Sequence, residues 1–455
     1  MDRIVIIGGG ISGLSLAYFV LEKDPAADIV VFESEKRLGG KIWTDRSEGF
    51  LCEGGVNGFL DNRPMTLELA SKIGIKPLRS NDASRKRFIF SDNRLQRLPE
   101  SPPTFFTSGL LSLLGRLRVM AEVIIRGNPP EEETLAAFAK RRLGREAYEK
   151  LIDPMASGIY AGNPETLSLR ACFPKVYDLE KNYGGLVRGM IALQRAKKKA
   201  GSDEKVGAGP GGTLTSFHNG MGEVVDALRT VLGDRVRTGF KAVSIDKKGR
   251  GYQVFFSDGS GIEAGKVIIA SPAYAASEIL KALDGHLSNI VASIPYPSLS
   301  VVCLGYRKEK IKASLDGFGF LVPSAEKRKI LGTLWDSSIF PNRAPEGHVL
   351  LRSMVGGARA SSLALENDSR LLKLVEKEML DIMGIRSDPD FVRIYRHEMA
   401  IPQYTVGHLG RLEEIDSILS KFTNLYLTGN AYRGVSVNDC VENSYKLAGR
   451  IAESR

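Results

Sequence analysis

Cysteine is scarce in this sequence. The 455 residues include only four cysteines, at positions 52, 172, 303 and 440, and no two of them form a CxxC pair. This spacing favours neither a zinc site nor a disulfide framework. So few cysteines fit a reducing compartment, and we therefore expect a cytoplasmic protein.

Long hydrophobic runs and histidine clusters are also lacking. No stretch approaches the roughly 18 uninterrupted apolar residues of a membrane-spanning helix. The amino terminus begins a strand within its first few residues and does not resemble a signal peptide. The five histidines stand at no metal-ligand spacing, and no Ser-His-Asp order is recognisable. We therefore predict no metal and no side-chain nucleophile.

Positive charge is in excess. The formal net charge is +10, which favours acidic partners such as carboxylated substrates or anionic lipid. Lysine and arginine are spread along the chain without a nucleic-acid-binding motif, so we do not expect nucleic acid as a partner. The content of 43% hydrophobic and 25% charged residues is ordinary for a globular protein with a sizeable core.

A glycine-rich segment near the amino terminus has the pattern of a dinucleotide-binding turn. A short apolar run, Ile4 to Ile7, precedes Gly8, Gly10 and Gly13, and a helical pattern follows to about Lys23. Gly8 would permit the tight turn, Gly10 the approach of a pyrophosphate, and Gly13 the packing of helix on strand. The helix N-terminus offers free N–H groups to phosphates.

An acidic residue follows at the expected distance. The second predicted strand, Ile29 to Phe32, ends at Glu33, which stands 20 residues beyond Gly13. Its carboxylate can accept hydrogen bonds from ribose hydroxyls. This is the only complete fingerprint in the chain, whereas a flavin reductase normally needs a second site for NAD(P)H. We therefore predict an oxidase or dehydrogenase that uses FAD and passes electrons to oxygen or a quinone.

Three further segments support flavin. Arg37-Leu38-Gly39-Gly40-Lys41 and Glu53 to Gly58 resemble the R-x-G-G and downstream glycine segments of the amine-oxidase-like flavoprotein superfamily. Near the carboxyl end, Gly434 to Cys440 opens a helix whose N-terminus would stabilise negative charge on the reduced ring. The predicted FAD-binding residues are Gly8, Gly9, Gly10, Ile11, Ser12, Gly13, Glu33, Ser34, Gly40, Lys41, Gly55, Val56, Asn57, Gly58, Val243, Asn430, Val435, Ser436 and Val437.

These patterns predict an α/β fold with three parts. A Rossmann-like FAD-binding domain of amine-oxidase or p-hydroxybenzoate-hydroxylase-like topology would comprise residues 1–80, 213–280 and 421–455. A mixed-sheet substrate domain would comprise 81–103 and 281–420, and a helical insertion 104–200. The Gly-rich residues 201–212 have no strand before them, so we interpret them as a mobile connection and not a second nucleotide site.

The helical insertion begins with a strongly apolar stretch. Residues 104–126 include Leu111 and Leu114, with Arg116, Arg118 and Arg126 among and beside them. This composition is typical of an interfacial helix that contacts a membrane peripherally, on the inner face of the cell membrane. An internal helix with solvated arginines is an equally good interpretation.

Over nearly its whole length the chain resembles the protoporphyrinogen oxidase family of haem biosynthesis, which includes bacterial coproporphyrinogen III oxidases. The motifs that carry the resemblance are residues 7–14, Glu33-Ser34 with 37–40, 87–90, 317–324, 335–337, 401–408 and 434–440. The resemblance implies removal of six electrons from a porphyrinogen by FAD, with O₂ as acceptor and H₂O₂ as product. Hydride would leave a meso carbon for flavin N5, with no catalytic side chain. It also implies transfer of the porphyrin product to ferrochelatase. The protein would be a monomer or a homodimer.

The same resemblance implies a set of substrate residues. Arg87 would pair with a propionate, because a guanidinium fork suits a carboxylate. Phe318, Gly319 and Leu321 would hold the macrocycle, with Gly319 leaving room for its plane, and Met354 would line the same pocket. Two positions depart from the family. Asn57 stands where mitochondrial members often carry arginine, and Lys41 replaces an aromatic residue of some members.

Other functions share the flavin fold. Another amine oxidase would need an aromatic cage before the flavin, and none is recognisable. A non-enzymatic escort protein would have a degraded glycine fingerprint, whereas this one is intact. If the chain belongs to this family, we predict protoporphyrinogen IX as its substrate, with coproporphyrinogen III as the alternative.

Overall fold

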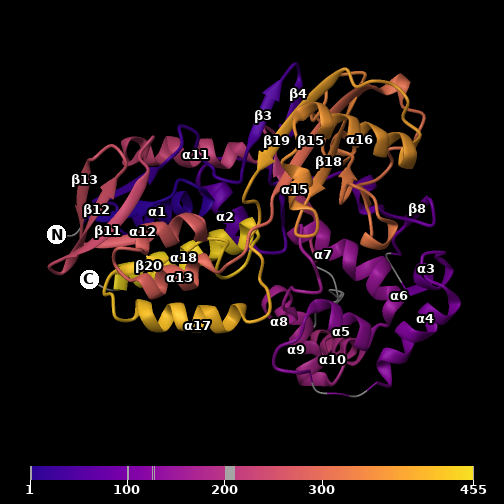
Figure 1. Cartoon of the computed structure of the whole chain (residues 1–455), viewed down its shortest axis with the longest axis horizontal. Helices are drawn as coiled ribbons and strands as arrows, with labels where there is room; N and C mark the ends of the chain where they lie inside the picture. The colour runs from indigo at the N-terminus through magenta and orange to yellow at the C-terminus, as the bar shows by residue number, and fades with distance from the viewer. Residues whose placement is uncertain (1–2, 100–101, 126, 128, 200–210, 454–455) are drawn as a thin grey trace.

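A parallel sheet forms the centre of the FAD-binding unit, at the left of Figure 1. The computed structural model describes residues 3–99, 102–125, 127, 129–199 and 211–453. The strand order is β10-β2-β1-β14-β20, and all the pairs are parallel. The strands are β1 (Ile4–Ile7), β2 (Ile29–Glu33), β10 (Val236–Thr238), β14 (Lys266–Ile269) and β20 (Leu425–Leu427).

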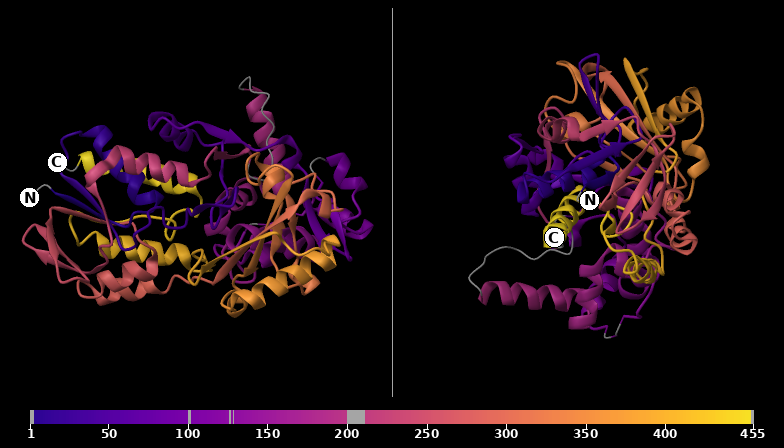
Figure 2. Two further views of the ribbon diagram at one scale, coloured as in Figure 1. Left: turned by 90° about the horizontal axis from the view of Figure 1, so that it is seen from above. Right: turned by 90° about the vertical axis from the view of Figure 1, so that its left-hand side faces the viewer.

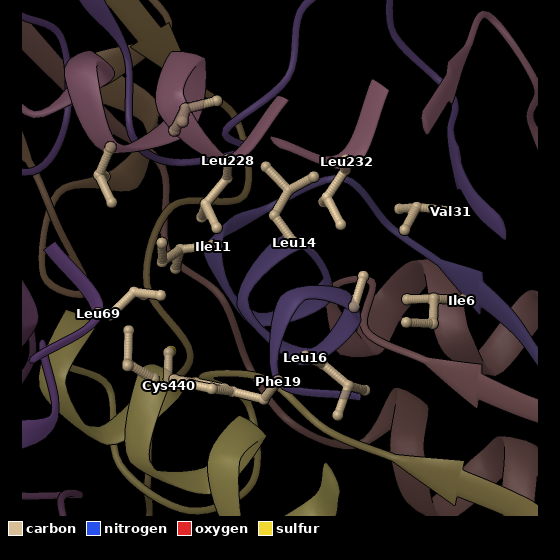
Figure 3. Close-up of a cluster of buried hydrophobic side chains, with 14 of the residues drawn as sticks. Ile6, Ile11, Leu14, Leu16, Phe19, Val31, Leu69, Leu228, Leu232 and Cys440 are labelled. Carbon is tan, nitrogen blue, oxygen red and sulfur yellow. The ribbon is translucent and has the colours of Figure 1, made fainter. Parts of the chain in front are cut away.

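Both faces of this sheet are buried, which explains the continuous apolar runs of its strands. On one face Ile4 and Ile6 pack against α1 (Ile11–Lys23), α11 (Gly222–Leu232) and α18 (Val437–Glu453), as Figure 3 shows for Ile6 and its neighbours. On the other face Val5 and Ile7 pack against a second cluster. The elements on that side are β11 (Ala242–Lys248), β12 (Gly251–Phe256), β13 (Gly261–Ala264), α12 (Ala273–Leu280), α13 (Gly285–Ala292) and α17 (His408–Leu419).

The second unit contains a seven-stranded mixed sheet in the order β19-β15-β18-β17-β16-β7-β8. Its strands are β7 (Arg87–Ser91), β8 (Arg94–Arg97), β15 (Leu299–Arg307), β16 (Gly319–Leu321), β17 (Gly332–Leu334), β18 (His348–Gly356) and β19 (Phe391–His397). One face buries Val302, Phe320 and Val355 against α16 (Asp368–Met383). The other face points toward the FAD-binding unit.

Helices dominate residues 102–199, at the lower right of Figure 1. They are α3 (Pro102–Thr107), α4 (Leu113–Met120), α5 (Leu135–Arg142), α6 (Arg145–Ala147), α7 (Asp153–Tyr160), α8 (Leu169–Cys172), α9 (Pro174–Tyr183) and α10 (Leu186–Lys199). A π-helical turn, Tyr148–Ile152, precedes α7. In both views of Figure 2, α10 projects from the rest of the molecule. Across the described residues no helix has the length and apolar character needed to cross a bilayer.

Shorter elements join the units. β3 (Thr44–Ser47) pairs with β4 (Phe50–Glu53), and β5 (Phe59–Leu60), β9 (Leu214–Phe217) and β6 (Pro77–Arg79) form a small sheet. The remaining α-helices of the described residues are α2 (Pro64–Lys72), α14 (Asp336–Ile339) and α15 (Ser361–Ala364). The predicted fold class is confirmed. The predicted mobile connection lies mostly outside the described residues.

Candidate flavin and substrate site

The first glycine turn is shaped by its neighbours and open on one side. Gly8 has φ +118°, and an added Cβ would lie 2.9 Å from the carbonyl carbon of Ala270. A Cβ on Gly13 would lie 2.0 Å from the carbonyl oxygen of Gly8. Gly10 precedes α1, and a Cβ there would meet nothing within 4 Å. The backbone at Gly10 therefore leaves room for a diphosphate at the helix N-terminus.

A second glycine loop lies against the first. The Gly39 N–H donates to the carbonyl oxygen of Gly9 at 2.9 Å, and Gly10 and Gly39 form an isolated parallel bridge. The ideal Cβ position of Gly40 is 3.5 Å from Gly10 Cα. The two loops form one cradle.

Cationic side chains gather beside this cradle. Arg37 donates to the carbonyl oxygens of Leu38, Gly40 and Ile42 and lies over the Trp43 ring. Lys41 Nζ donates to the Met399 carbonyl oxygen at 2.5 Å. Burial, together with the charge of Arg37, lowers the pKa of Lys41 to about 8. A bound diphosphate would relieve this repulsion, so the cluster fits FAD.

Glu33 lies beside the first glycine turn. Its Oε2 accepts a hydrogen bond from the Gly9 N–H at 2.7 Å, and its Oε1 accepts from the Ser34 hydroxyl and the Glu35 N–H. Val243 lies at a β-bulge in β11. The ribose contact of Glu33 and the adenine contact of Val243 stay predictions.

The Glu53–Gly58 segment connects the cradle to the seven-stranded sheet. A Cβ on Gly55 would meet the Lys41 carbonyl oxygen at 2.1 Å. Arg352 Nη1 donates to the carbonyl oxygens of Glu53 and Gly55, at 3.0 and 3.2 Å. The amide oxygen and nitrogen of Asn57 are buried and have no hydrogen-bond partner. Burying such a group without a partner costs free energy, so Asn57 fits a position that a ligand completes.

The carboxyl-terminal segment lies beside the same cradle. Ser444 Oγ donates to the Ser12 carbonyl oxygen at 2.8 Å, which holds α18 against α1. Ser436 Oγ accepts from the Asp439 N–H at 3.1 Å just before α18 begins at Val437. Both chain ends therefore contribute a helix N-terminus to this region. Val435 itself packs against the core of the helical unit, and the flavin contacts of Asn430, Val435, Ser436 and Val437 stay predictions.

Strand register places four predicted substrate residues on one face of the seven-stranded sheet. Gly319 pairs with Arg87 across the parallel β16–β7 contact, Leu321 pairs with Gly332, and Gly332 pairs with Met354. Because paired residues of adjacent strands point to the same face, Arg87, Gly319, Leu321 and Met354 share it. Arg352, two residues before Met354, is on this face too and binds the Glu53–Gly58 segment.

Phe318 lies just before β16 and is held by its backbone. Its N–H donates to the Lys86 carbonyl oxygen at 2.8 Å, and its ring lies 5.1 Å from Arg87 Cζ. The structure gives Gly319 a different reason from the predicted one. Its φ is +125°, and an added Cβ would meet the Thr333 carbonyl oxygen at 2.1 Å. Close packing of β16 on β17 therefore requires glycine here, whatever the ligand.

Sequence reasoning missed the part that α7 contributes. A Cβ on Gly158 would lie 2.9 Å from Leu321 Cδ2, and Ala161, with φ +47°, belongs to a small cluster that Met354 packs against. The helical unit thus forms a wall beside the substrate face. The small residues Gly158, Ala161 and Gly162, close together in the sequence, were the available signal.

A parallel βαβ unit with an open glycine turn, a second glycine loop and a terminal helix defines an FAD-dependent oxidoreductase. The chain belongs to the flavin-containing amine oxidoreductase family, whose sequence profile matches residues 11–452. The predicted resemblance to protoporphyrinogen oxidases is confirmed within that family.

Named relatives cover almost the full chain. Chloroplastic protoporphyrinogen oxidase of Oryza sativa subsp. japonica is 34% identical, over 99% of this chain and 88% of its own. Coproporphyrinogen III oxidase of Bacillus subtilis (strain 168) is 29% identical, over 97% and 96%. The crystal structure of a putative protoporphyrinogen oxidase from Exiguobacterium sp. 255-15 matches with a TM-score of 0.85 and 27% identity, over 100% and 99%.

Proposed function

We propose that the protein oxidises protoporphyrinogen IX to protoporphyrin IX with oxygen as acceptor, and that coproporphyrinogen III is the alternative substrate. One observation carries the proposal: Arg87, Leu321 and Met354 share one face of the seven-stranded sheet. Arg352 lies on the same face and binds the Glu53–Gly58 segment, which contains predicted flavin-binding residues. The names of the relatives from rice and B. subtilis support the same substrate class.

Each part of this face has a task in the proposal. Bound FAD would supply the chemistry by accepting a hydride from a meso carbon of the porphyrinogen. Arg87 holds a propionate, and the Phe318 ring lies beside its guanidinium. Leu321 and Met354 exclude water from the macrocycle, and the unpartnered Asn57 amide offers a hydrogen bond where substrate and flavin segments meet.

The number of carboxylates decides the substrate ranking. Protoporphyrinogen carries two propionates and coproporphyrinogen four, and each carboxylate taken from water needs a charged or hydrogen-bonding partner. Arg87 is the single guanidinium that we assign to a propionate. One such anchor favours the substrate with fewer carboxylates when the additional ones cannot stay in solvent.

Anaerobic flavin bleaching tests the activity directly. Each porphyrinogen is mixed with the yellow protein without oxygen, and air is then admitted. We expect bleaching, followed by reoxidation with stoichiometric H₂O₂ and porphyrin fluorescence. No bleaching by either porphyrinogen, or reduction by NADPH alone at the turnover rate, contradicts the proposal. A much higher kcat/KM for coproporphyrinogen reverses the ranking only.

A second proposal concerns peripheral membrane contact through α4 and its neighbours. Leu113 is 66% exposed, Leu114 79% and Ile124 74%, so the stretch is not ordinary core. Leu111, by contrast, is 2% exposed and belongs to the interior, so it is not part of this exposed apolar surface. A cavity of about 640 Å³ beside α3 is lined by Arg94 and Arg97, cations that favour anionic lipid.

Vesicle flotation tests this contact. Replacing Leu113 and Leu114 by serine should lower the fraction bound to vesicles that contain anionic phospholipid, because the apolar side chains insert into the interface. The exposed Val231→Ser, on α11, is the matched control. If the wild-type protein binds neither neutral nor anionic vesicles, the proposal of membrane contact fails, while the oxidase assignment stands.

A further inference from the structure

Two aromatic rings stack in the interior beside the loop between β20 and α18, residues 428–436, which we call the flavin loop because it contains predicted flavin-binding residues. Tyr404 and His408 are 2% and 0% exposed, and their ring centroids lie 4.0 Å apart at an interplanar angle of 12°. The chain turns between them at Gly407, which has φ +83°. Neither ring belongs to the glycine cradle or to the substrate face.

Both rings bind carbonyl groups of a single loop. Tyr404 Oη donates to the Asn430 carbonyl oxygen at 2.6 Å, and His408 Nε2 lies 3.1 Å from the Tyr432 carbonyl oxygen. These carbonyls belong to the segment between β20 and α18, which carries predicted flavin residues and leads into the N-terminus of α18.

The chemistry of these contacts fixes the state of His408. A carbonyl oxygen only accepts, so Nε2 must carry the hydrogen. His408 Nδ1 is buried without a hydrogen-bond partner, and burial lowers the pKa of His408 to about 4. The imidazole is therefore neutral at neutral pH, with its proton on Nε2. A neutral ring that donates one bond to a backbone carbonyl suits a fixed structural contact.

The residues around Tyr404 also bind the helical unit. The Ser168 N–H donates to the Tyr404 carbonyl oxygen at 2.8 Å, Gln403 Nε2 donates to that of Tyr160 at 2.8 Å, and the Val406 N–H donates to that of Thr166 at 3.0 Å. Residues 403–408 thus contact the helical unit on one side and the flavin loop on the other.

We propose that Tyr404 and His408 are positioning residues for the flavin. Their side-chain donors hold the loop before α18 in place, and through it the N-terminus of α18, which is predicted to lie near the reduced ring. The inference rests on the proposed function only in that the protein uses FAD, and it does not depend on which porphyrinogen is the substrate. A helix N-terminus stabilises nearby negative charge only within about its first turn, so a displaced loop weakens both FAD binding and the reduced state.

Three substitutions separate the donor from the ring. His408→Phe keeps a stacked ring but removes the donor, and Tyr404→Phe removes the other donor. His408→Gln restores an N–H at about the Nε2 position without the ring. The control is His286→Phe, because His286 is an exposed histidine whose partner is the Glu414 carboxylate and not a carbonyl group of this loop.

Apoprotein titration with FAD and the flavin reduction potential are the readouts. We expect His408→Phe and Tyr404→Phe each to weaken FAD binding about three- to tenfold, the loss of one hydrogen bond, with a more negative potential. His408→Gln should recover most of the affinity, and His286→Phe should match wild type.

Several results overturn the proposal. They are wild-type affinity and potential in both phenylalanine variants, or an equal loss in His408→Gln and His408→Phe, which would assign the effect to packing. If His408→Phe does not fold, Tyr404→Phe decides alone, because it preserves the ring. If neither porphyrinogen bleaches the flavin, the proposed function is contradicted, but these binding measurements stay valid.

Discussion

Lys41 is the residue at which burial and charge have the clearest consequence for the cofactor. Its pKa is lowered to about 8, first by burial and then by Arg37. An FAD diphosphate near Nζ would raise this pKa, so binding above pH 8 takes up a proton. FAD affinity should therefore be steady below pH 8 and should fall as the pH rises through 8.

Titration of the apoprotein with FAD between pH 6 and 10 measures this dependence. Lys41→Met should bind FAD more weakly at pH 7 and lose the decline above pH 8. A wild-type affinity that does not change across this range would place Lys41 away from the diphosphate.

Arg87 is the residue on which substrate recognition depends most. Arg87→Ala should lower kcat/KM for a porphyrinogen about ten- to hundredfold, since a hydrogen bond to a charged group contributes about 1.5–3 kcal/mol. The flavin spectrum should not change. The exposed Arg235→Ala, in the FAD-binding unit, is the control. An equal loss with a substrate analogue that lacks propionates would show that Arg87 acts structurally.

At the scale of elements, β16 depends on Gly319. An added methyl group would meet the Thr333 carbonyl oxygen at 2.1 Å and Leu334 Cα at 2.8 Å, on a backbone with φ +125°. Gly319→Ala should therefore lower the free energy of unfolding by about 3 kcal/mol or more, as clash and backbone strain add. Urea denaturation measures the loss. Gly285→Ala, where a Cβ meets nothing within 4 Å, should change stability little.

Local patterns were enough to predict the FAD-binding elements. The apolar run before Gly8 and the acid at Glu33 are short-range signals, and the structure places β1, the glycine turn, α1 and β2 as they indicate. The helix after the glycine turn begins at Ile11, before the last of the three glycines, and α16 begins at Asp368, where the Asn367 side chain caps it. Helix ends depend on such caps more than on periodicity.

The pairing of strands that are far apart in the chain could not be predicted from the sequence. Alternation shows which residues of one strand share a face, but not that β16 pairs with the distant β7, which puts Gly319 opposite Arg87. Nor could it indicate that Arg352 binds the carbonyl groups of Glu53 and Gly55, or that Tyr404 stacks on His408. The substrate residues were predicted from the family resemblance, whereas the contacts that position them could be seen only in the fold.

At the scale of the whole molecule, a group of charges is buried between the β3–β4 pair and the seven-stranded sheet. Glu53, at the end of β4, is 0% exposed, and its carboxyl accepts hydrogen bonds from the Thr44 hydroxyl and the Met221 N–H. Arg352, on β18, lies 2.9 Å from Asp336 and binds the Glu53 carbonyl oxygen. Burial raises the pKa of Glu53 to about 7, and Arg343 and Arg352 only partly oppose this shift.

This buried carboxyl should make the junction of the units sensitive to pH. The folded pKa of Glu53 is above its ordinary value of 4.5, so the folded state holds a proton that the unfolded chain releases. The stabilisation is complete below pH 4.5 and is lost as the pH rises through about 7. Between pH 5.5 and 8.5, wild type should lose about 2 kcal/mol more than Glu53→Gln, which cannot titrate. Denaturant unfolding of both proteins at the two pH values measures the difference. Parallel losses in the two proteins would mean that Glu53 is ionised throughout and that its charge is compensated by the neighbouring arginines.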